Sequence, residues 1–243
     1  MKPALDLLAV HTSDAAGSIA VGCGGRIAAA EFEAAGKHAP VLLAAILDLL
    51  DTTGARLEDL GAVAVTTGPG SFTGIRVGLA TVQGLAAARR WPVLPCDSLR
   101  AAAAAWSGRI EGPLAILLDA RRGEVYAGLF DVEGGGTEPL AEPFCAPPAA
   151  AAERLARLAR AALQRFGASR PLAIAGSGAA LLPVLDGIEV RQLGPPPVPV
   201  ARALVDLARA GCLAPIEPQA LEPTYLRKSD AEVRRDSLRG SGT

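Results

Sequence analysis

Short apolar runs separated by glycine-rich turns dominate the first hundred residues. The run 7–10 ends at polar residues, and the runs 18–22 and 26–30 flank the turn Cys23-Gly24-Gly25. Runs of this length bounded by turn residues predict three short strands, the last two forming a hairpin. The pattern continues with a predicted helix at 40–50, a buried strand at 62–67, a helix at 73–89 and an edge strand at 91–95, whose prolines exclude a central place in a sheet.

The same crude order begins again in the second half of the chain. It predicts strands at 114–120 and 124–130, an amphipathic helix at 150–166, and a strand from 171 that enters the small-residue loop 176–178. Because hairpin, helix, strand and glycine-rich turn occur twice, we predict an α/β protein with a duplicated fold. We expect lobes at 1–107 and 108–228 and a mobile tail at 229–243.

Two further segments complete the outline. The alanine tract 101–105 predicts a helix just before the seam between the lobes. The proline-rich stretch 194–199 predicts a stiff connector.

Composition limits the classes of function further. The 243 residues are half apolar with a formal net charge of −1, which excludes a wholly disordered chain and argues against a strongly basic nucleic-acid-binding face. The four cysteines stand apart, which is typical of buried, reduced thiols. We find no apolar core of a signal peptide and no apolar run of the roughly 18 residues that a membrane span needs. We therefore expect a soluble cytoplasmic protein.

The run Gly68-Pro69-Gly70-Ser71 joins a predicted strand to a predicted helix. Such a turn has the shape of an anion site, because free backbone N–H groups and a positive helix end face outward. The run lacks the lysine of a P-loop, does not match GxGxxG and does not place Ser71 in a nucleophile elbow. A tight turn uses glycine without any ligand, so the sequence leaves both interpretations open.

Both helices of the first lobe are more apolar than one sheet contact requires. Gly74, Gly78 and Gly84 lie within the second helix, where each costs about 1 kcal/mol relative to alanine, so we expect another backbone to approach closely. The helix at 40–50 is apolar nearly all round, which is typical of complete burial or of an interface. We predict a protein–protein interface formed by Leu42, Leu43, Ile46, Leu47, Leu50, Gly74, Val77, Gly78, Thr81 and Leu85. The alternative is that these helices cover each other and a third helix.

Five motifs follow one another along the chain. They are His11-Thr12-Ser13, Lys37-His38, the run from Gly68 to Gly84, the hairpin from Asp119 to Tyr126, and Pro223-Thr224-Tyr225-Leu226-Arg227. Together they resemble the TsaB/YeaZ family of bacterial threonylcarbamoyladenosine-biosynthesis subunits. The resemblance covers most of the chain, and its Gly-Pro-Gly-Ser-Phe-Thr-Gly run is highly specific.

The resemblance implies an actin/Hsp70/sugar-kinase (ASKHA) fold with two RNase H-like lobes, in agreement with the duplication. It also implies a non-catalytic subunit that binds and activates a TsaD-like transferase, which adds threonylcarbamoyl to adenosine 37 of tRNAs reading ANN codons. A TsaE-like ATPase would join the complex, tRNA would be bound indirectly through it, and no membrane would be involved. The first two helices would form the pairing surface, and the isolated protein would form a homodimer through it.

The chain departs from the family in ways that bear on catalysis. Its two histidines, His11 and His38, are too few and too far apart to predict a metal site. His11 replaces the family's aspartate, and an imidazole is a poor Mg²⁺ ligand. Asp119 is the only carboxylate expected at the ends of the first strands of the two lobes. We therefore expect no catalytic residue, no metal and no intrinsic cofactor.

A weak ATP or ADP site at the complex interface is left open. Its residues would be Thr12, Ser13, Gly70, Ser71, Asp119, Gly176 and Gly178, while Arg121 and Arg122 would fix the hairpin or face solvent. The alternative function is an autonomous ATP-dependent phosphotransferase or ATPase of the same fold, and the family's old peptidase label is weaker still. The basic residues of the tail are balanced by acidic ones, which favours a solvated segment over a tRNA contact.

Overall fold

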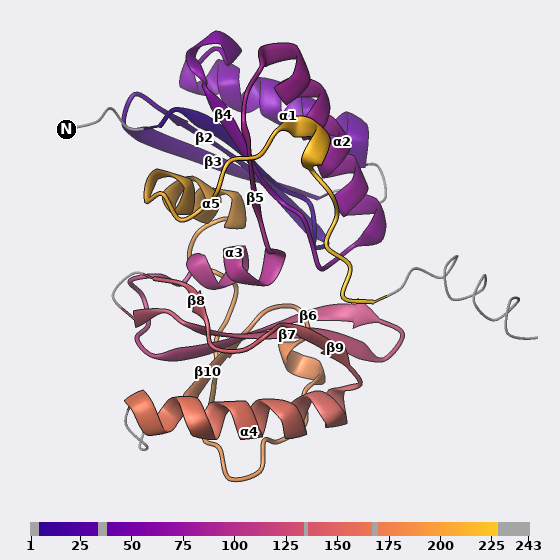
Figure 1. The fold of residues 1–243 in the computed structure, drawn as a ribbon, viewed down its shortest axis with the longest axis vertical. Helices are drawn as coiled ribbons and strands as arrows, with labels where there is room; N and C mark the ends of the chain where they lie inside the picture. Colours follow the sequence, from indigo (N-terminus) through magenta and orange to yellow (C-terminus); the bar gives the residue numbers. More distant parts are fainter. Residues whose placement is uncertain (1–4, 34–37, 134–135, 167–169, 228–243) are drawn as a thin grey trace, which may run out of the picture.

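The protein is built from five layers stacked in two lobes, as the computed structural model in Figure 1 shows. The structure describes residues 5–33, 38–133, 136–166 and 170–227. The predicted tail at 229–243 and Lys37 lie outside these residues. From one end to the other, the layers are a helix pair, a sheet, a second helix pair, a second sheet and one long helix.

The first sheet has the strand order β3-β2-β1-β4-β5. Its strands are β1 (Leu7–His11), β2 (Ala16–Cys23), β3 (Arg26–Glu33), β4 (Ala62–Thr66) and β5 (Val93–Cys96). Ala9 of β1 pairs with Ala20 of the antiparallel β2 and with Ala64 of the parallel β4. All residues of β1 and β4 are buried, because helices cover both faces of the sheet. The predicted hairpin and the predicted edge position of β5 are confirmed.

The outer layer of the first lobe consists of α1 (His38–Thr53) and α2 (Phe72–Arg89). Both helices were predicted, and they contact each other. Ser71 caps α2, since its side chain accepts a hydrogen bond from the Gly74 N–H. The 3₁₀ turn η1 (Leu57–Asp59) connects α1 to β4. Leu42, Ile46, Ile75, Leu79 and Val82 anchor the core between this layer and the sheet.

The second sheet repeats the order of the first. Its strands are β6 (Pro113–Arg121), β7 (Glu124–Asp131), β8 (Glu138–Pro139), β9 (Phe144–Ala146), β10 (Leu172–Ala175) and β11 (Val190–Gln192). They run in the order β11-β10-β6-β7-β8, with β9 also paired to β7, so an antiparallel hairpin again flanks parallel strands. The predicted duplication is confirmed.

One helix covers the outer face of the second sheet. This is α4 (Pro148–Phe166), which packs on β6, β7 and β9. Where the first lobe has α2, the second has only the short turn η3 (Ala179–Leu181) after β10. The first lobe therefore carries one long outer helix without a counterpart in the second.

The middle layer is formed by α3 (Ser98–Ala104) and α5 (Val200–Arg209). The predicted helix of the alanine tract corresponds to α3, whose Leu99 and Ala103 join the core of the second sheet. The sequence reasoning missed α5, which packs on β1 and β2 through Leu204 and Val205. The range 108–228 predicted for the second lobe thus contains a helix that packs on the first. Among the helices in the described ranges, none combines the length and the apolar character needed to cross a membrane.

Candidate docking surface and lobe boundary

The polar end of β1 is buried and bonded within the first lobe. A ring nitrogen of His11 lies 3.1 Å from Thr66 Oγ1, and Ser13 Oγ lies 2.9 Å from the same hydroxyl. His11 is only 4% exposed, and this burial lowers its pKa to about 4 against the opposing effect of the Asp14 charge. The imidazole is therefore neutral at pH 7, and its polar contact is to Thr66.

The glycine run packs its backbone on the residues that follow β1. Gly70 has φ +153°, and a methyl group at its Cα would overlap the Ser13 carbonyl oxygen. The Ser71 N–H donates to that same oxygen at 2.7 Å, and the Gly74 N–H donates to Ser71 Oγ at 3.2 Å. Two of the N–H groups that would face an anion are thus bonded within this chain. Four predicted nucleotide-site residues, Thr12, Ser13, Gly70 and Ser71, do lie together.

Gly74 and Gly78 are buried inside the first lobe, where both pack against Thr12. A methyl group on Gly74 would overlap the Thr12 carbonyl oxygen, and one on Gly78 would overlap Thr12 Oγ1. The close neighbour expected at these glycines is therefore Thr12 of the same chain, through its backbone at Gly74 and its side chain at Gly78, so both glycines face the interior of the lobe. The predicted interface as a whole stays a prediction.

The other three predicted nucleotide-site residues meet at the first strand of the second lobe. A methyl group on Gly176 would overlap the Leu117 carbonyl oxygen, and the Gly178 N–H donates to that oxygen at 2.9 Å. The Asp119 N–H donates to Ser177 Oγ at 3.2 Å, next to these glycines. Asp119 also fixes the hairpin turn, because its carboxylate accepts from the Arg121 N–H and pairs with the Arg121 guanidinium.

Asp14 brings a second carboxylate to this place, which the sequence reasoning missed. Ser177 Oγ donates to Asp14 Oδ1 at 3.5 Å, and this contact across the lobe boundary joins residues that directly follow Ser13 and Gly176, one predicted residue from each group. The expectation that Asp119 would be the only carboxylate there is corrected, because the turn after β1 carries Asp14 toward the other lobe. In the described part of the chain, no three His, Cys, Asp or Glu residues cluster as metal ligands would.

The predicted interface residues divide into a buried and an exposed set. Leu42, Ile46, Leu50, Gly74 and Gly78 are buried in the first lobe, and Val77, Thr81 and Leu85 are half-buried. Leu43 and Leu47 remain exposed, by 46% and 52%. On α1, Leu42 and Ile46 therefore pack toward the sheet, while Leu43 and Leu47 face away from it.

The exposed side of α2 is lined with very small residues, which the predicted interface omitted. They are Ala80, Gly84, Ala87 and Ala88. Within the part of the chain that the structure describes, a methyl group on Gly84 would touch nothing within 4 Å, so this part of the fold has no steric need for a glycine there. We define the docking surface as Leu43 and Leu47 of α1 with Ala80, Gly84 and Ala87 of α2. The signal for Gly84 was present in the sequence, but only the structure separates it from Gly74 and Gly78.

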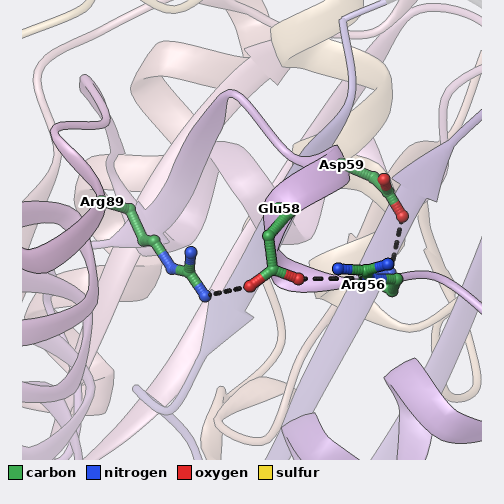
Figure 2. Close-up of polar contacts among 4 residues, drawn as sticks. All are labelled: Arg56, Glu58, Asp59 and Arg89. Atoms are coloured by element: carbon green, nitrogen blue, oxygen red, sulfur yellow. Dashed lines mark hydrogen bonds and ion pairs between the residues drawn. The ribbon is translucent and has the colours of Figure 1, made fainter.

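Ion pairs fix the C-terminal end of α2. Figure 2 shows Glu58 of η1 between Arg89, at 2.6 Å, and Arg56, at 3.3 Å. The hydrogen bond from Arg89 lowers the pKa of the Glu58 carboxyl, so this carboxyl stays charged at neutral pH. The Arg56 N–H donates to Asp59 in the same turn. The end of α2 is thereby tied to the segment that follows α1.

Comparison with solved structures identifies the family. YeaZ from Pseudomonas aeruginosa is 30% identical, with a TM-score of 0.76, over 91% of this chain and 100% of that chain. The chain belongs to the TsaB/YeaZ family. Another P. aeruginosa structure, of a protein described as similar to the peptidase YeaZ, matches with the same score and identity over 92% of this chain. The ASKHA fold of two RNase H-like lobes is thus confirmed.

Sequence comparisons agree with the TsaB/YeaZ assignment. The TsaB protein of Escherichia coli, named for tRNA threonylcarbamoyladenosine biosynthesis, is 39% identical over 124 residues, which are 49% of this chain and 52% of that protein. TsaB of Bacillus subtilis is 34% identical over 105 residues, 43% of this chain and 45% of that protein. The chain thus spans about half the length of the curated relatives it matches. Residues 32–188 match the family model for TsaD, tRNA N6-adenosine threonylcarbamoyltransferase.

Proposed function

We propose that this chain is the accessory subunit of a complex that adds threonylcarbamoyl to adenosine 37 of ANN-decoding tRNAs. In this proposal it binds and activates a TsaD-like transferase through the docking surface, and tRNA contacts it only through the complex. Membership of the TsaB/YeaZ family and the TsaD-type match support the assignment. A TsaE-like ATPase would join the complex, which would work in the cytoplasm.

Gly84 is the observation that carries the docking part of the proposal. A glycine inside a helix costs about 1 kcal/mol relative to alanine, and no atom of the described residues outside its own helix would lie within 4 Å of a methyl group at Gly84. Beside it lie Ala80 and Ala87, and Leu43 and Leu47 are exposed on the neighbouring helix. A flat surface of small residues lets the backbone of another helix come close, and the exposed leucines supply apolar area to bury. In the isolated chain the same surface would pair two copies.

We assign the chain no reaction of its own. At the end of β1, where phosphotransferases of this fold use a carboxylate, the neutral and buried His11 is bonded to Thr66. Gly176, Gly178 and the Asp119 N–H lie together at the lobe boundary, so weak ATP or ADP binding at the complex interface stays part of the proposal. Turnover of ATP by the purified chain alone would contradict it.

Reconstitution tests the proposed function. The TsaD-like subunit, the TsaE-like ATPase and the adenylate-forming enzyme of the same organism are mixed with tRNA, ATP, threonine and bicarbonate, with and without this chain. We expect threonylcarbamoylated tRNA, measured by mass spectrometry of nucleosides, only when the chain is present. Equal rates with and without it would overturn the proposal.

A further inference from the structure

The C-terminal segment, residues 216–227, crosses from the first lobe to the second along α2 (Figure 1). It begins at the free edge of β5, where Ile216 and Val93 exchange two backbone hydrogen bonds of 2.8 and 3.0 Å. The Gln83 side chain of α2 then donates to the carbonyl oxygens of Pro218 and Leu221, each at 3.2 Å. Leu221 is buried in the first core, so this part of the segment is firmly attached to the first lobe.

The next residues of the segment lie over the start of the glycine run. The Thr224 N–H donates to the Thr67 carbonyl oxygen at 2.8 Å, and the two threonine hydroxyls lie 3.0 Å apart. Gly68 has φ +112°, and a methyl group there would come within 2.5 Å of the Thr224 carbonyl oxygen. Tyr225 stacks on Phe72 at a centroid distance of 5.6 Å. The first glycine of the run is therefore needed for the passage of the C-terminal segment.

The last two residues of the segment belong to the other lobe. Leu226 packs against the core of the second sheet, and the Arg227 guanidinium lies 2.7 Å from Glu124 at the start of β7. This hydrogen bond raises the pKa of Arg227, and the side chains of both partners remain 30% exposed. Among the described residues of the segment, Leu226 and the partly solvated Arg227–Glu124 pair make the attachment to the second lobe, whereas the attachment to the first lobe has many parts.

We propose that the C-terminal segment is a strap that holds the two lobes in the observed arrangement, and that the Arg227–Glu124 pair is its release point. A partly exposed ion pair is weak and is screened by salt, while the contacts of Ile216, Leu221 and Thr224 are not. Loss of the pair detaches the segment from the second lobe and leaves it on the first, so the lobes can shift relative to each other about the middle layer of α3 and α5 that still joins them. This inference concerns the isolated chain and does not depend on the proposed function.

The test compares the unmodified chain with Arg227→Gln and with the charge swap E124R/R227E. p-Acetylphenylalanine is placed at the exposed positions Asp51 of α1 and Arg157 of α4 and carries the spin labels, so the native cysteines stay in place. Pulsed electron resonance then measures the distance between the two labels, one on each lobe. We expect a longer and broader distance distribution in Arg227→Gln, and in the unmodified chain at about 1 M salt. The charge swap should restore the narrow distribution.

Hydrogen exchange supplies the second measurement. The Thr224 amide should exchange at the same rate in Arg227→Gln as in the unmodified chain, because the segment stays bonded to Thr67 of the first lobe. Faster exchange of this amide would contradict a release at the second lobe alone. Arg160→Gln is the matched control, because it breaks the Arg160–Asp186 pair on α4, away from the segment, and should change neither measurement. An unchanged distance distribution in Arg227→Gln, failure of the swap to restore it, or an equal effect of the control would overturn the proposal.

Discussion

Substitutions at Gly84 should affect the stability of the isolated chain and its affinity for a partner in opposite directions. Gly84→Ala should stabilise the isolated chain, because alanine is the better helix former and its methyl group meets nothing within 4 Å. The expected gain is about 0.5–1 kcal/mol, which corresponds to about 1–4 °C in melting temperature for a chain of this size. Gly78→Ala is the contrasting variant, since its methyl group would overlap Thr12 Oγ1. This variant should have a free energy of unfolding about 1–3 kcal/mol lower than that of the unmodified chain.

Gly84→Leu then tests the docking surface itself. The leucine side chain points away from the core, so the fold should be kept, but it would stand where the partner's backbone approaches. We expect the affinity for the TsaD-like subunit to fall at least tenfold, which is about 1.4 kcal/mol. Urea unfolding measures the stability, and isothermal titration measures the affinity. Ala161→Leu, at an exposed position of α4, is the matched control and should bind like the unmodified chain.

Two results would refute this reasoning. If Gly84→Ala destabilised the chain, the glycine would be required by the fold and would say nothing about a partner. If Gly84→Leu folded and bound the TsaD-like subunit with unchanged affinity, the docking surface would be wrongly placed.

Three further predictions follow from the same geometry. The His11 pKa is 6.5 in the unfolded chain and about 4 when folded, so the unfolded state binds more protons between these two pH values. Urea unfolding should therefore show that the free energy of unfolding falls by on the order of 3 kcal/mol from pH 7 to pH 4. His11→Asn should make the free energy of unfolding less dependent on pH in this range. Leu47→Glu should weaken association, seen by sedimentation, and leave the free energy of unfolding within about 0.5 kcal/mol, since Leu47 is exposed. Gly70→Ala should lower the free energy of unfolding, measured with urea, by about 1–3 kcal/mol, because the φ of +153° and the Ser13 carbonyl both exclude a side chain. An unaltered urea midpoint would contradict the packing of Gly70 on Ser13.

The sequence predicted the five strands of the first sheet and β6, β7 and β10 of the second, because these strands are apolar runs bounded by turns. It missed β8, β9 and β11, which are only two or three residues long and largely exposed or half-buried. It did not reveal α5, although Ala201, Leu204, Val205 and Ala208 follow a helical period. The connector predicted at 194–199 is present, because these residues join β11 to α5, but the helix that starts directly after the N-cap residue Pro199 was not predicted.

The docking surface was harder to predict. The apolar residues of α1 lie along two sides of the helix, and their spacing does not show which side packs on the sheet. Leu42 and Leu43 look alike in sequence, and only packing places one inside and the other outside. The helix glycines pose the same problem, since Gly78 accommodates Thr12 and Gly84 faces solvent. Pairs distant in sequence, such as Arg227 with Glu124, depend on the complete fold and leave no local signal.

Hydrogen exchange of the chain with and without its TsaD-like partner tests the central claim most directly. The account predicts that binding slows exchange in peptides covering Leu43–Leu47 and Ala80–Ala88, while peptides from α4 stay unchanged. Protection confined to α4 or to the second sheet, with α1 and α2 exchanging as in the free chain, would contradict it.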